Sequence, residues 1–534
     1  LHTVKVIGWS AVNIQNLRGA IGSYVGGTIY GDIIIDESKL PSGWVYDNVM
    51  VIAKYTANAT GVLPGFNKEF TYTYDEKDNG DGTYTVSIAT DSLDNLPTKI
   101  IFTSKNNLLT VDKLNTSKVT TMIQMFRSCE NLTRINCRLD TSGVTNEITQ
   151  AFMACKKLEY LDMTGFVNSN IKHAVALFQD CQTITHIDGL DTWDISGITD
   201  FTNMFANCYA LSDLTAVENW DMSNAEILDT MFARCNAIES FNLTKWDVSN
   251  VTNMRYMFGW ARGPVSIDMT GWDTSNVTNM YYMFGFCNKL TEIKGLENFN
   301  TAKVTNMQYM LTEYQGTELD LSKWNVSSVT NMYRLFDGCL NLQSLNISGW
   351  KTSNVTNMQG MFNNCPSLTT ITGLSDLETS KVTDMSHMFN GCKKLTSLDL
   401  SKWNVSKVES MYSAFNNCSS ITELNLSGFT NVKDWGSFCR NCTNLVSITG
   451  LDTSKYSTNF GSNGNNFLSF EGCASLRNIK DINVSFTSAM AKANSLTIDN
   501  DYWMLLGWGW FRGLTNLVDI TFTGQVELYD TMPV

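Results

Sequence analysis

Cysteine and histidine are the residue types in this chain with the widest chemical reach, and the sequence holds 14 and 4 of them respectively. Cysteines could form disulfides or bind zinc, and Cys439 and Cys442 have the Cys-x-x-Cys spacing of a redox motif. The histidines are His2, His173, His186 and His387, and no two of them share a metal-binding spacing. The positions at which the cysteines recur indicate whether they are reactive or buried in the core.

Most cysteines recur at one position of a repeat that is about 26 residues long. The cysteine stands three residues after a position that is usually phenylalanine, as Cys287 follows Phe284. Ala261, Tyr314 and Leu514 fill the cysteine position in other copies, which neither a disulfide nor a metal site would tolerate. We therefore predict reduced thiols that are buried as small apolar side chains. The recurring cysteines are Cys129, Cys155, Cys181, Cys208, Cys235, Cys287, Cys339, Cys365, Cys392, Cys418, Cys442 and Cys473.

No motif in the sequence predicts catalysis. There is no phosphate-binding loop, no dinucleotide fingerprint after a strand and no nucleophile motif paired with a histidine. The formal net charge is −14 and no run is rich in lysine or arginine, which disfavours nucleic acid and anionic membranes as partners. No stretch approaches the roughly 18 apolar residues of a membrane span. We predict a protein without enzyme activity, cofactor or metal.

Each repeat combines two hydrophobic periods. Val277, Met280, Met283, Phe284 and Cys287 follow the spacing of one face of a short helix. The other half of a repeat alternates, as in Leu398-Asp-Leu400, which predicts a short strand. A unit of strand and helix this short cannot bury its apolar face alone, so neighbouring copies must stack. The sequence therefore predicts an α/β solenoid with parallel strands on one face and short helices on the other.

A column of aromatic residues follows the strand half of the repeat. We predict that these rings stack at a corner of each turn, where they pack the core. An aromatic row could also bind sugars, and this alternative stays open. The column consists of Trp193, Trp220, Trp246, Trp272, Phe299, Trp324, Trp350, Trp403 and Phe429.

The repeated pattern Cys-x-x-Leu-x-x-Leu-x-Leu, followed by Val-Thr-x-Met-x-x-Met-Phe, resembles the BspA-like leucine-rich repeats of microbial surface proteins. The resemblance covers roughly residues 108–524. It implies a right-handed solenoid, exposure on the surface of a cell or particle, and adhesion or recognition without catalysis. Repeats of this kind also occur in virus-encoded proteins, so the resemblance does not identify the host.

The two ends of the chain depart from the repeat. Residues 70–74 and 83–88 alternate on either side of an Asp-Asn-Gly-Asp-Gly turn, which predicts a hairpin, and residues 49–53 suit another strand. The Asp-rich turn lacks the full spacing of a calcium loop, so a plain turn is favoured. We predict a β-domain in residues 1–107 that attaches or caps, a solenoid in 108–484, and a degenerate repeat or cap in 485–534.

On the strand face of the first copies, several exposed residues differ from those that most copies carry at the same positions. Most copies carry small polar residues there, but the first copies carry larger ones, and arginine and tyrosine are favoured types in binding hot spots. We predict that a partner binds at this cluster; packing against the N-terminal domain is the alternative. The predicted binding residues are Arg134, Arg138, Tyr160, Asp162, His186 and Asp188.

These observations together predict an extracellular, surface-exposed recognition or adhesion protein that binds a host protein or glycan. The alternative is a structural or receptor-binding part of a virion fibre or surface filament, assembled through the N-terminal domain. The sequence opens with neither an initiator methionine nor a signal peptide, so we expect any signal or anchor to lie outside it.

Overall fold

The computed structural model divides the chain into two compact units. The first unit comprises Leu1–Ile227 and Met231–Ile238, and the second comprises Leu228–Thr230 and Glu239–Val534. The first 48 residues and most of those predicted as a C-terminal cap lie outside the part that the structure describes. The described residues are 49–56, 63–67, 72–90, 96–166, 170–455, 470–482, 516 and 519–522.

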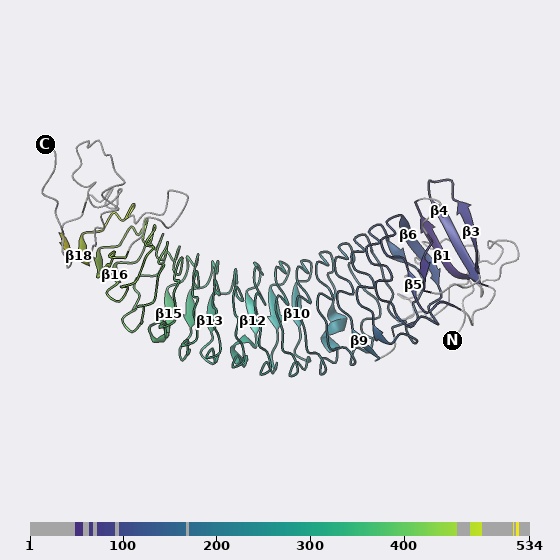
Figure 1. The fold of residues 1–534 in the computed structure, drawn as a ribbon, viewed down its shortest axis with the longest axis horizontal. Coiled ribbons are helices and arrows are strands. Elements are labelled where there is room, and N and C mark those ends of the chain that lie inside the picture. Colours follow the sequence, from purple (N-terminus) through teal and green to yellow (C-terminus); the bar gives the residue numbers. More distant parts are fainter. Residues whose placement is uncertain are drawn as a thin grey trace, which may run out of the picture. The chain divides into compact units, whose positions relative to one another are not determined.

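The first unit contains a five-stranded sheet in the order β3-β4-β1-β6-β7. The predicted hairpin is confirmed, because β3 and β4 pair antiparallel along their length, and the predicted strand from residue 49 is β1. Strand β6 pairs antiparallel with β1 and parallel with β7, so it joins the hairpin sheet to the first repeat strand (Figure 1). The strands are β1 (Val49–Tyr55), β3 (Tyr72–Asp78), β4 (Tyr84–Thr90), β6 (Leu108–Leu114) and β7 (Arg134–Ile135), and β2 (Gly65–Phe66) pairs with β5 (Ile100–Ile101).

The repeats form turns of a parallel β-solenoid, as predicted. In the first unit β8 (Asn146–Glu147) pairs parallel with β9 (Ile171–His173), and one short 3-10 helix, η4 (Thr215–Asn219), follows among the described residues. In the second unit each strand lies in register with that of the next turn within a sheet, so Phe241, Ile267 and Ile293 stand side by side. Figure 1 shows these short strands one after another along each stack.

The second unit has three parallel sheets among its described residues. The first contains β10 (Ser240–Asn242), β11 (Ser266–Asp268) and β12 (Glu292–Lys294). The second contains β13 (Glu318–Asp320), β14 (Ser344–Asn346) and β15 (Thr370–Thr372). The third contains β16 (Glu423–Asn425), β17 (Ser447–Thr449), β18 (Asn478–Ile482) and β19 (Asp519–Phe522). Two short 3-10 helices, η5 (Leu296–Asn298) and η6 (Leu374–Asp376), follow β12 and β15.

The prediction of a helix opposite the strands is wrong. The segment from Met280 to Cys287 makes two successive tight turns, and the N–H of Met283 donates to the carbonyl of Met280 at 3.1 Å. Tyr282 and Phe286 have φ of 58° and 63°, in the left-handed region that a right-handed helix excludes. A positive φ at the third residue of a four-residue turn is the mark of a type II turn.

Hydrogen bonds to the next turn explain why the helix does not form. The N–H groups of Tyr282, Phe284 and Phe286 donate to carbonyls of the next turn at 2.9, 3.0 and 2.9 Å. In a helix these donors would point along the helix axis to the preceding turn of the helix itself. Stacked copies instead offer a carbonyl at every second residue, so the chain bonds across turns.

Continuous columns of apolar side chains fill the interior. The rings of Phe258 and Phe284 stack with centroids 5.6 Å apart, and both side chains are buried. The thiol of Cys287 is also buried and donates to the carbonyl of Phe258 at 3.0 Å. Burial raises the pKa of the Cys287 thiol to about 12, so it remains protonated. The predicted burial of the recurring cysteines is confirmed; only Cys137, which lies outside this column, is half-buried.

The aromatic column packs at a corner, as predicted. The indoles of Trp324 and Trp350 stack with centroids 6.2 Å apart and are buried. The indole N–H of Trp350 also donates to the carbonyl of Leu321 in the preceding turn, at 2.9 Å. The Trp350 ring therefore fills its corner and satisfies a backbone acceptor at once. Among the described residues no helix has the length and hydrophobicity that would let it cross a membrane.

Candidate functional site

Part of the predicted strand-face cluster in the first unit forms a chain of polar contacts. The Tyr160 hydroxyl donates to a carboxylate oxygen of Asp188 at 2.8 Å. The other oxygen of Asp188 lies 2.9 Å from Nε2 of His186, and Nδ1 of His186 lies 3.4 Å from a carboxylate oxygen of Asp213. The sequence-based prediction did not include Asp213. Tyr160, His186 and Asp188 are thus brought together on successive turns.

The other three predicted residues add contacts of their own. Arg134 pairs with Tyr160 of the next turn in a parallel bridge and forms an ion pair with Glu159 at 3.8 Å. Arg138 lies beyond the end of β7, and its guanidinium donates to the carbonyl of Thr164 at 2.9 Å. Asp162 accepts the N–H of Thr164 at 2.8 Å, which closes a local turn.

The cluster is acidic and exposed. Hydrogen bonds from the N–H and hydroxyl of Thr215 hold the pKa of Asp213 below its usual value, with His186 adding to the effect. Asp188 and Asp213 both keep more than two fifths of their side chains exposed. The ring nitrogens of His186 contact the carboxylates of Asp188 and Asp213 rather than a serine or cysteine nucleophile. No group of three or more His, Cys, Asp or Glu that could hold a metal occurs among the described residues.

A second and larger cluster lies on the tight-turn segments of the second unit. We call it the aromatic surface, and it spans four successive turns. The rings of Tyr256 and Tyr282 lie 4.6 Å apart, those of Tyr282 and Tyr309 4.3 Å apart, and those of Tyr309 and Tyr333 5.0 Å apart. The aromatic surface consists of Arg255, Tyr256, Trp260, Tyr281, Tyr282, Phe286, Tyr309, Tyr333 and Arg334.

The aromatic surface has a second row of rings beside the first. The ring of Trp260 stacks on that of Phe286 with centroids 5.2 Å apart and an angle of 2° between their planes. Trp260 also stacks on Tyr282, at 5.1 Å, which joins the two rows. Most of these rings are half-buried, since each covers part of its neighbour. The contacts hold the rings in fixed positions before any partner arrives.

Arginine side chains lie at both ends of the aromatic surface. The guanidinium carbon of Arg255 lies 5.1 Å from the ring centre of Tyr256, and that of Arg334 lies 5.5 Å from the ring centre of Tyr333. Both distances are within the range of cation–π contacts. Arg334 is also fixed by Asp337, whose carboxylate lies 2.9 Å from it. Burial against its neighbours raises the pKa of Tyr309 to about 12, so its hydroxyl stays neutral at physiological pH.

The aromatic residues occupy backbone positions that disfavour large side chains. Tyr256, Tyr282 and Tyr309 have φ of 52°, 58° and 55° at the first left-handed position of their turns. Other turns hold residues of many types at the same position, from Gly360 and Ser413 to Gln124, Thr230, Arg334 and His387. A bulky residue with positive φ is uncommon, and its backbone costs about 1–3 kcal/mol. This cost therefore recurs along the solenoid, and the turns of Tyr256, Tyr282 and Tyr309 differ from the others in carrying a tyrosine ring there.

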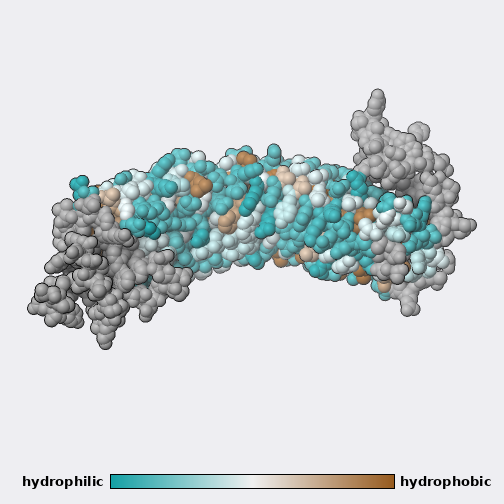
Figure 2. Space-filling view, turned by 90° about the horizontal axis from the view of Figure 1, so that it is seen from above, coloured by the Kyte–Doolittle hydropathy of each residue, from teal (hydrophilic) through white to brown (hydrophobic). Residues whose placement is uncertain are grey.

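None of the residues of this surface is among the predicted binding residues. The signal in the sequence is the aromatic residue that three successive copies carry at the position of Tyr256, Tyr282 and Tyr309, where the other copies carry non-aromatic residues or histidine. On the face shown in Figure 2 the surface is mostly hydrophilic with small separate hydrophobic spots. Extended hydrophobic patches are thus absent from the coloured part of this face.

The repeats match one family model. It is described as "Mycoplasma protein of unknown function, DUF285", and it matches residues 98–188, 176–292, 261–370 and 340–450. No curated protein matches the chain significantly.

Solved structures of bacterial leucine-rich repeat proteins are among those similar to the chain. A leucine-rich repeat protein from Bacteroides ovatus is 17% identical with a TM-score of 0.41, and the alignment covers 78% of this chain and 94% of that one. One from Eubacterium ventriosum is 13% identical with a TM-score of 0.29, covering 84% and 98%. One from Leptospira interrogans is 13% identical with a TM-score of 0.17, covering 59% and 90%. Because these scores are low, we draw no functional conclusion from them. The family matches run from residue 98 to residue 450, well over half of the chain, so the protein belongs to the DUF285 family.

Proposed function

We propose that this protein is a non-catalytic recognition protein and that its aromatic surface binds another protein. The observation that supports this most is the row of contacting tyrosine rings on successive turns, with an arginine at each end. Other turns carry residues of many other types at the position of Tyr256, Tyr282 and Tyr309, so the solenoid does not require these rings.

The chemistry of the aromatic surface favours a protein partner. Tyrosine, tryptophan and arginine are the types most enriched among interface hot spots. The surface combines all three, and its stacked rings are already ordered, so binding freezes few additional rotamers. Tyr309 keeps a neutral hydroxyl, because burial raises its pKa to about 12, and a neutral hydroxyl can donate to or accept from a partner's backbone.

The proposed setting is extracellular, on the surface of a cell. It is supported by the resemblance of the repeat motif to BspA-like surface proteins. The formal net charge of −14 also disfavours nucleic acid as a partner. The partner would be a host protein, and a glycan is a second class of partner. The hairpin sheet of β1, β3 and β4 would serve as the mount. A role in a virion fibre or surface filament is the alternative setting.

A binding array tests the proposal. The purified chain would be applied to arrays of extracellular proteins and of glycans, and each hit would be measured again with a Tyr256→Asn, Tyr309→Asn double variant. We expect protein binding to weaken by at least about 2 kcal/mol, as for loss of hot-spot residues. The thermal midpoint should not fall, because asparagine suits both backbone positions.

A second variant separates the two candidate surfaces. Arg134→Ala with Tyr160→Ala removes the exposed strand-face cluster of the first unit, and we expect it to leave protein binding unchanged. If this variant abolishes binding and the tyrosine variant does not, the binding surface is the strand-face cluster. If no extracellular protein binds the wild-type chain, the proposal is wrong.

A further inference from the structure

The aromatic corner column is interrupted at Leu377. Leu377 stands between Trp350 and Trp403 in the column, and its side chain is shorter than an indole and has no N–H. The indole of Trp403 donates to the carbonyl of Leu374 at 2.9 Å, as the indoles of Trp324 and Trp350 do to the turn before them. The turn that carries Leu377 provides no such donor to the turn of Trp350. The corner therefore lacks both the ring and its hydrogen bond.

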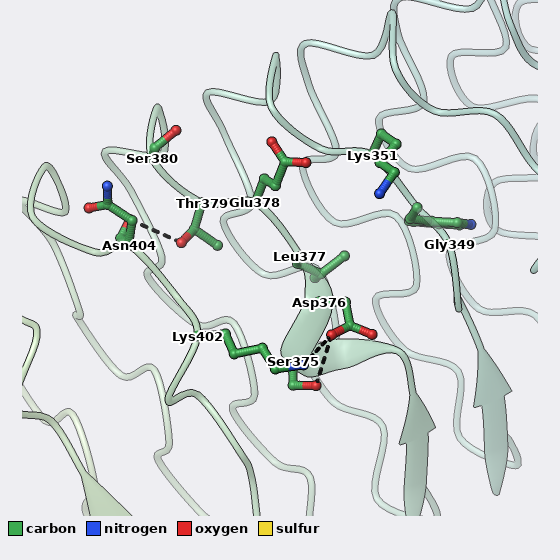
Figure 3. Close-up of a pocket in the computed structure, with 11 residues that line it drawn as sticks. Gly349, Lys351, Ser375, Asp376, Leu377, Glu378, Thr379, Ser380, Lys402 and Asn404 are labelled. Carbon is green, nitrogen blue, oxygen red and sulfur yellow. Dashed lines mark hydrogen bonds and ion pairs between the residues drawn. The ribbon is translucent and has the colours of Figure 1, made fainter.

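A pocket of about 450 Å³ lies at this interruption. Its walls come from three successive corners, as Figure 3 shows. Trp350 and Leu377 are buried and provide its apolar part, and polar side chains of the corners surround them. The volume lies within the range of small-molecule sites. The lining residues are Gly349, Trp350, Lys351, Ser375, Asp376, Leu377, Glu378, Thr379, Ser380, Lys402 and Asn404.

An equivalent corner shows what fills the space elsewhere. Residues 295–299 and 373–377 both run from a left-handed glycine through a 3-10 helix to the column position. In the first corner the column position is Phe299, whose ring stacks on Trp272 with centroids 6.3 Å apart. In the second it is Leu377. At the column position one corner thus carries a ring, and the corner with the pocket carries a shorter leucine side chain.

The polar groups of the pocket carry both signs of charge. Lys402 and Asp376 form an ion pair with 2.7 Å between their charged atoms. Lys351 and Glu378, on two successive turns, form no ion pair with another residue that the structure describes, and Figure 3 shows their charged ends beside the pocket. An anionic ligand would meet the carboxylates and a cationic ligand would meet the ammonium groups. A hydroxyl group can donate to a carboxylate and accept from an ammonium.

We propose that this corner pocket binds a neutral sugar residue. The hydroxyls of the sugar pair with Glu378, Lys351 and the Asp376–Lys402 pair, and its apolar face lies over Leu377 and Trp350, which form the apolar part of the pocket. The pocket is separate from the aromatic surface, so the sugar site and the proposed protein-binding function succeed or fail independently.

Saturation-transfer NMR with a panel of neutral mono- and disaccharides tests the site. Leu377→Phe should fill the pocket as Phe299 fills its own corner, and we expect sugar binding to weaken at least about tenfold. Its thermal midpoint should be equal to that of the wild type or higher, because the ring adds buried apolar area. If Leu377→Phe lowers the midpoint, the exposed variants Lys351→Met and Glu378→Gln decide the question, and both should weaken binding.

A matched control exists at the filled corner. Lys323 donates to Asn298 at 2.9 Å, in the same place as Lys402 beside Asp376. Lys402→Met should weaken sugar binding, whereas Lys323→Met should not. Three results would overturn the proposal: no neutral sugar binds at about 10 mM, Leu377→Phe folds and binds as well as the wild type, or only charged ligands such as free amino acids bind.

Discussion

One substitution can test whether the segment opposite the strands forms tight turns or a helix, because it should stabilise the turns but would destabilise a helix. Ala154 has φ of 59°, and its N–H donates to the carbonyl of Gln179 in the next turn at 2.7 Å. It occupies the third position of a turn closed by the N–H of Cys155, which donates to the carbonyl of Phe152 at 3.2 Å. We consider Ala154→Gly.

The expected size of the effect follows from the backbone. An alanine in the left-handed region costs roughly 1–2 kcal/mol, which glycine avoids. The greater freedom of glycine in the unfolded chain removes about 0.4–1 kcal/mol of that gain. Ala154→Gly should therefore stabilise its turn by between zero and about 1.5 kcal/mol. Had the segment been a helix, the same change would destabilise it by about 1 kcal/mol.

Ala151 provides the control, because it is buried and is not among the residues with positive φ. Ala151→Gly should destabilise the same segment by about 1 kcal/mol through loss of the methyl group and added flexibility. Hydrogen exchange of peptides from residues 126–180, followed by mass spectrometry, reports this local stability without assuming that a repeat array unfolds in one step. A loss of stability of about 1 kcal/mol in both variants would refute the turn assignment.

Three further predictions concern the packed columns. Alkylation of the denatured but unreduced chain should modify all 14 cysteines, and a chain that resists modification until it is reduced would show disulfides. Phe284→Ala should destabilise its region by about 3–5 kcal/mol, because it interrupts a buried stack of rings, and an unchanged urea midpoint would contradict this. In an alkaline titration followed by tyrosine absorbance, Tyr309 and Tyr314 should ionise near pH 12, since burial raises the pKa of each to about 12. The stability that the neutral forms of these two tyrosines contribute is complete below pH 10, the usual pKa of tyrosine, and is lost as the pH rises toward 12. Difference spectra of Tyr309→Phe and Tyr314→Phe that show both tyrosines ionising at pH 10 would contradict this prediction.

The candidate sites could be predicted only in part, since both depend on contacts between turns. Tyr160 and His186 were predicted as neighbours because their positions in successive copies correspond, and the structure brings them together through Asp188. Arg138 was predicted in the same cluster, but its side chain donates to the backbone carbonyl of Thr164 in the next turn. The position of an arginine in a repeat does not determine where its long, flexible side chain goes.

The repeat itself was determined by the sequence. Identical apolar types at a fixed spacing can be buried only if copies stack in register, so the columns of Phe284, Cys287 and Trp272 follow from the spacing alone. Parallel pairing of the strands follows as well, because each copy presents its strand in the same direction. These conclusions hold for any local backbone that keeps the columns aligned.

The tertiary structure alone decided the conformation between the columns. The spacing of Val277, Met280, Met283 and Phe284 places these side chains on one side of a helix, and it does the same for two successive tight turns. What separates the two is the destination of the N–H groups of Tyr282 and Phe284, which bond to the next turn. That choice depends on carbonyls about 26 residues away in sequence, and no local pattern contains them. The same is true of the aromatic surface and of the pocket at Leu377, which exist only where separate turns meet.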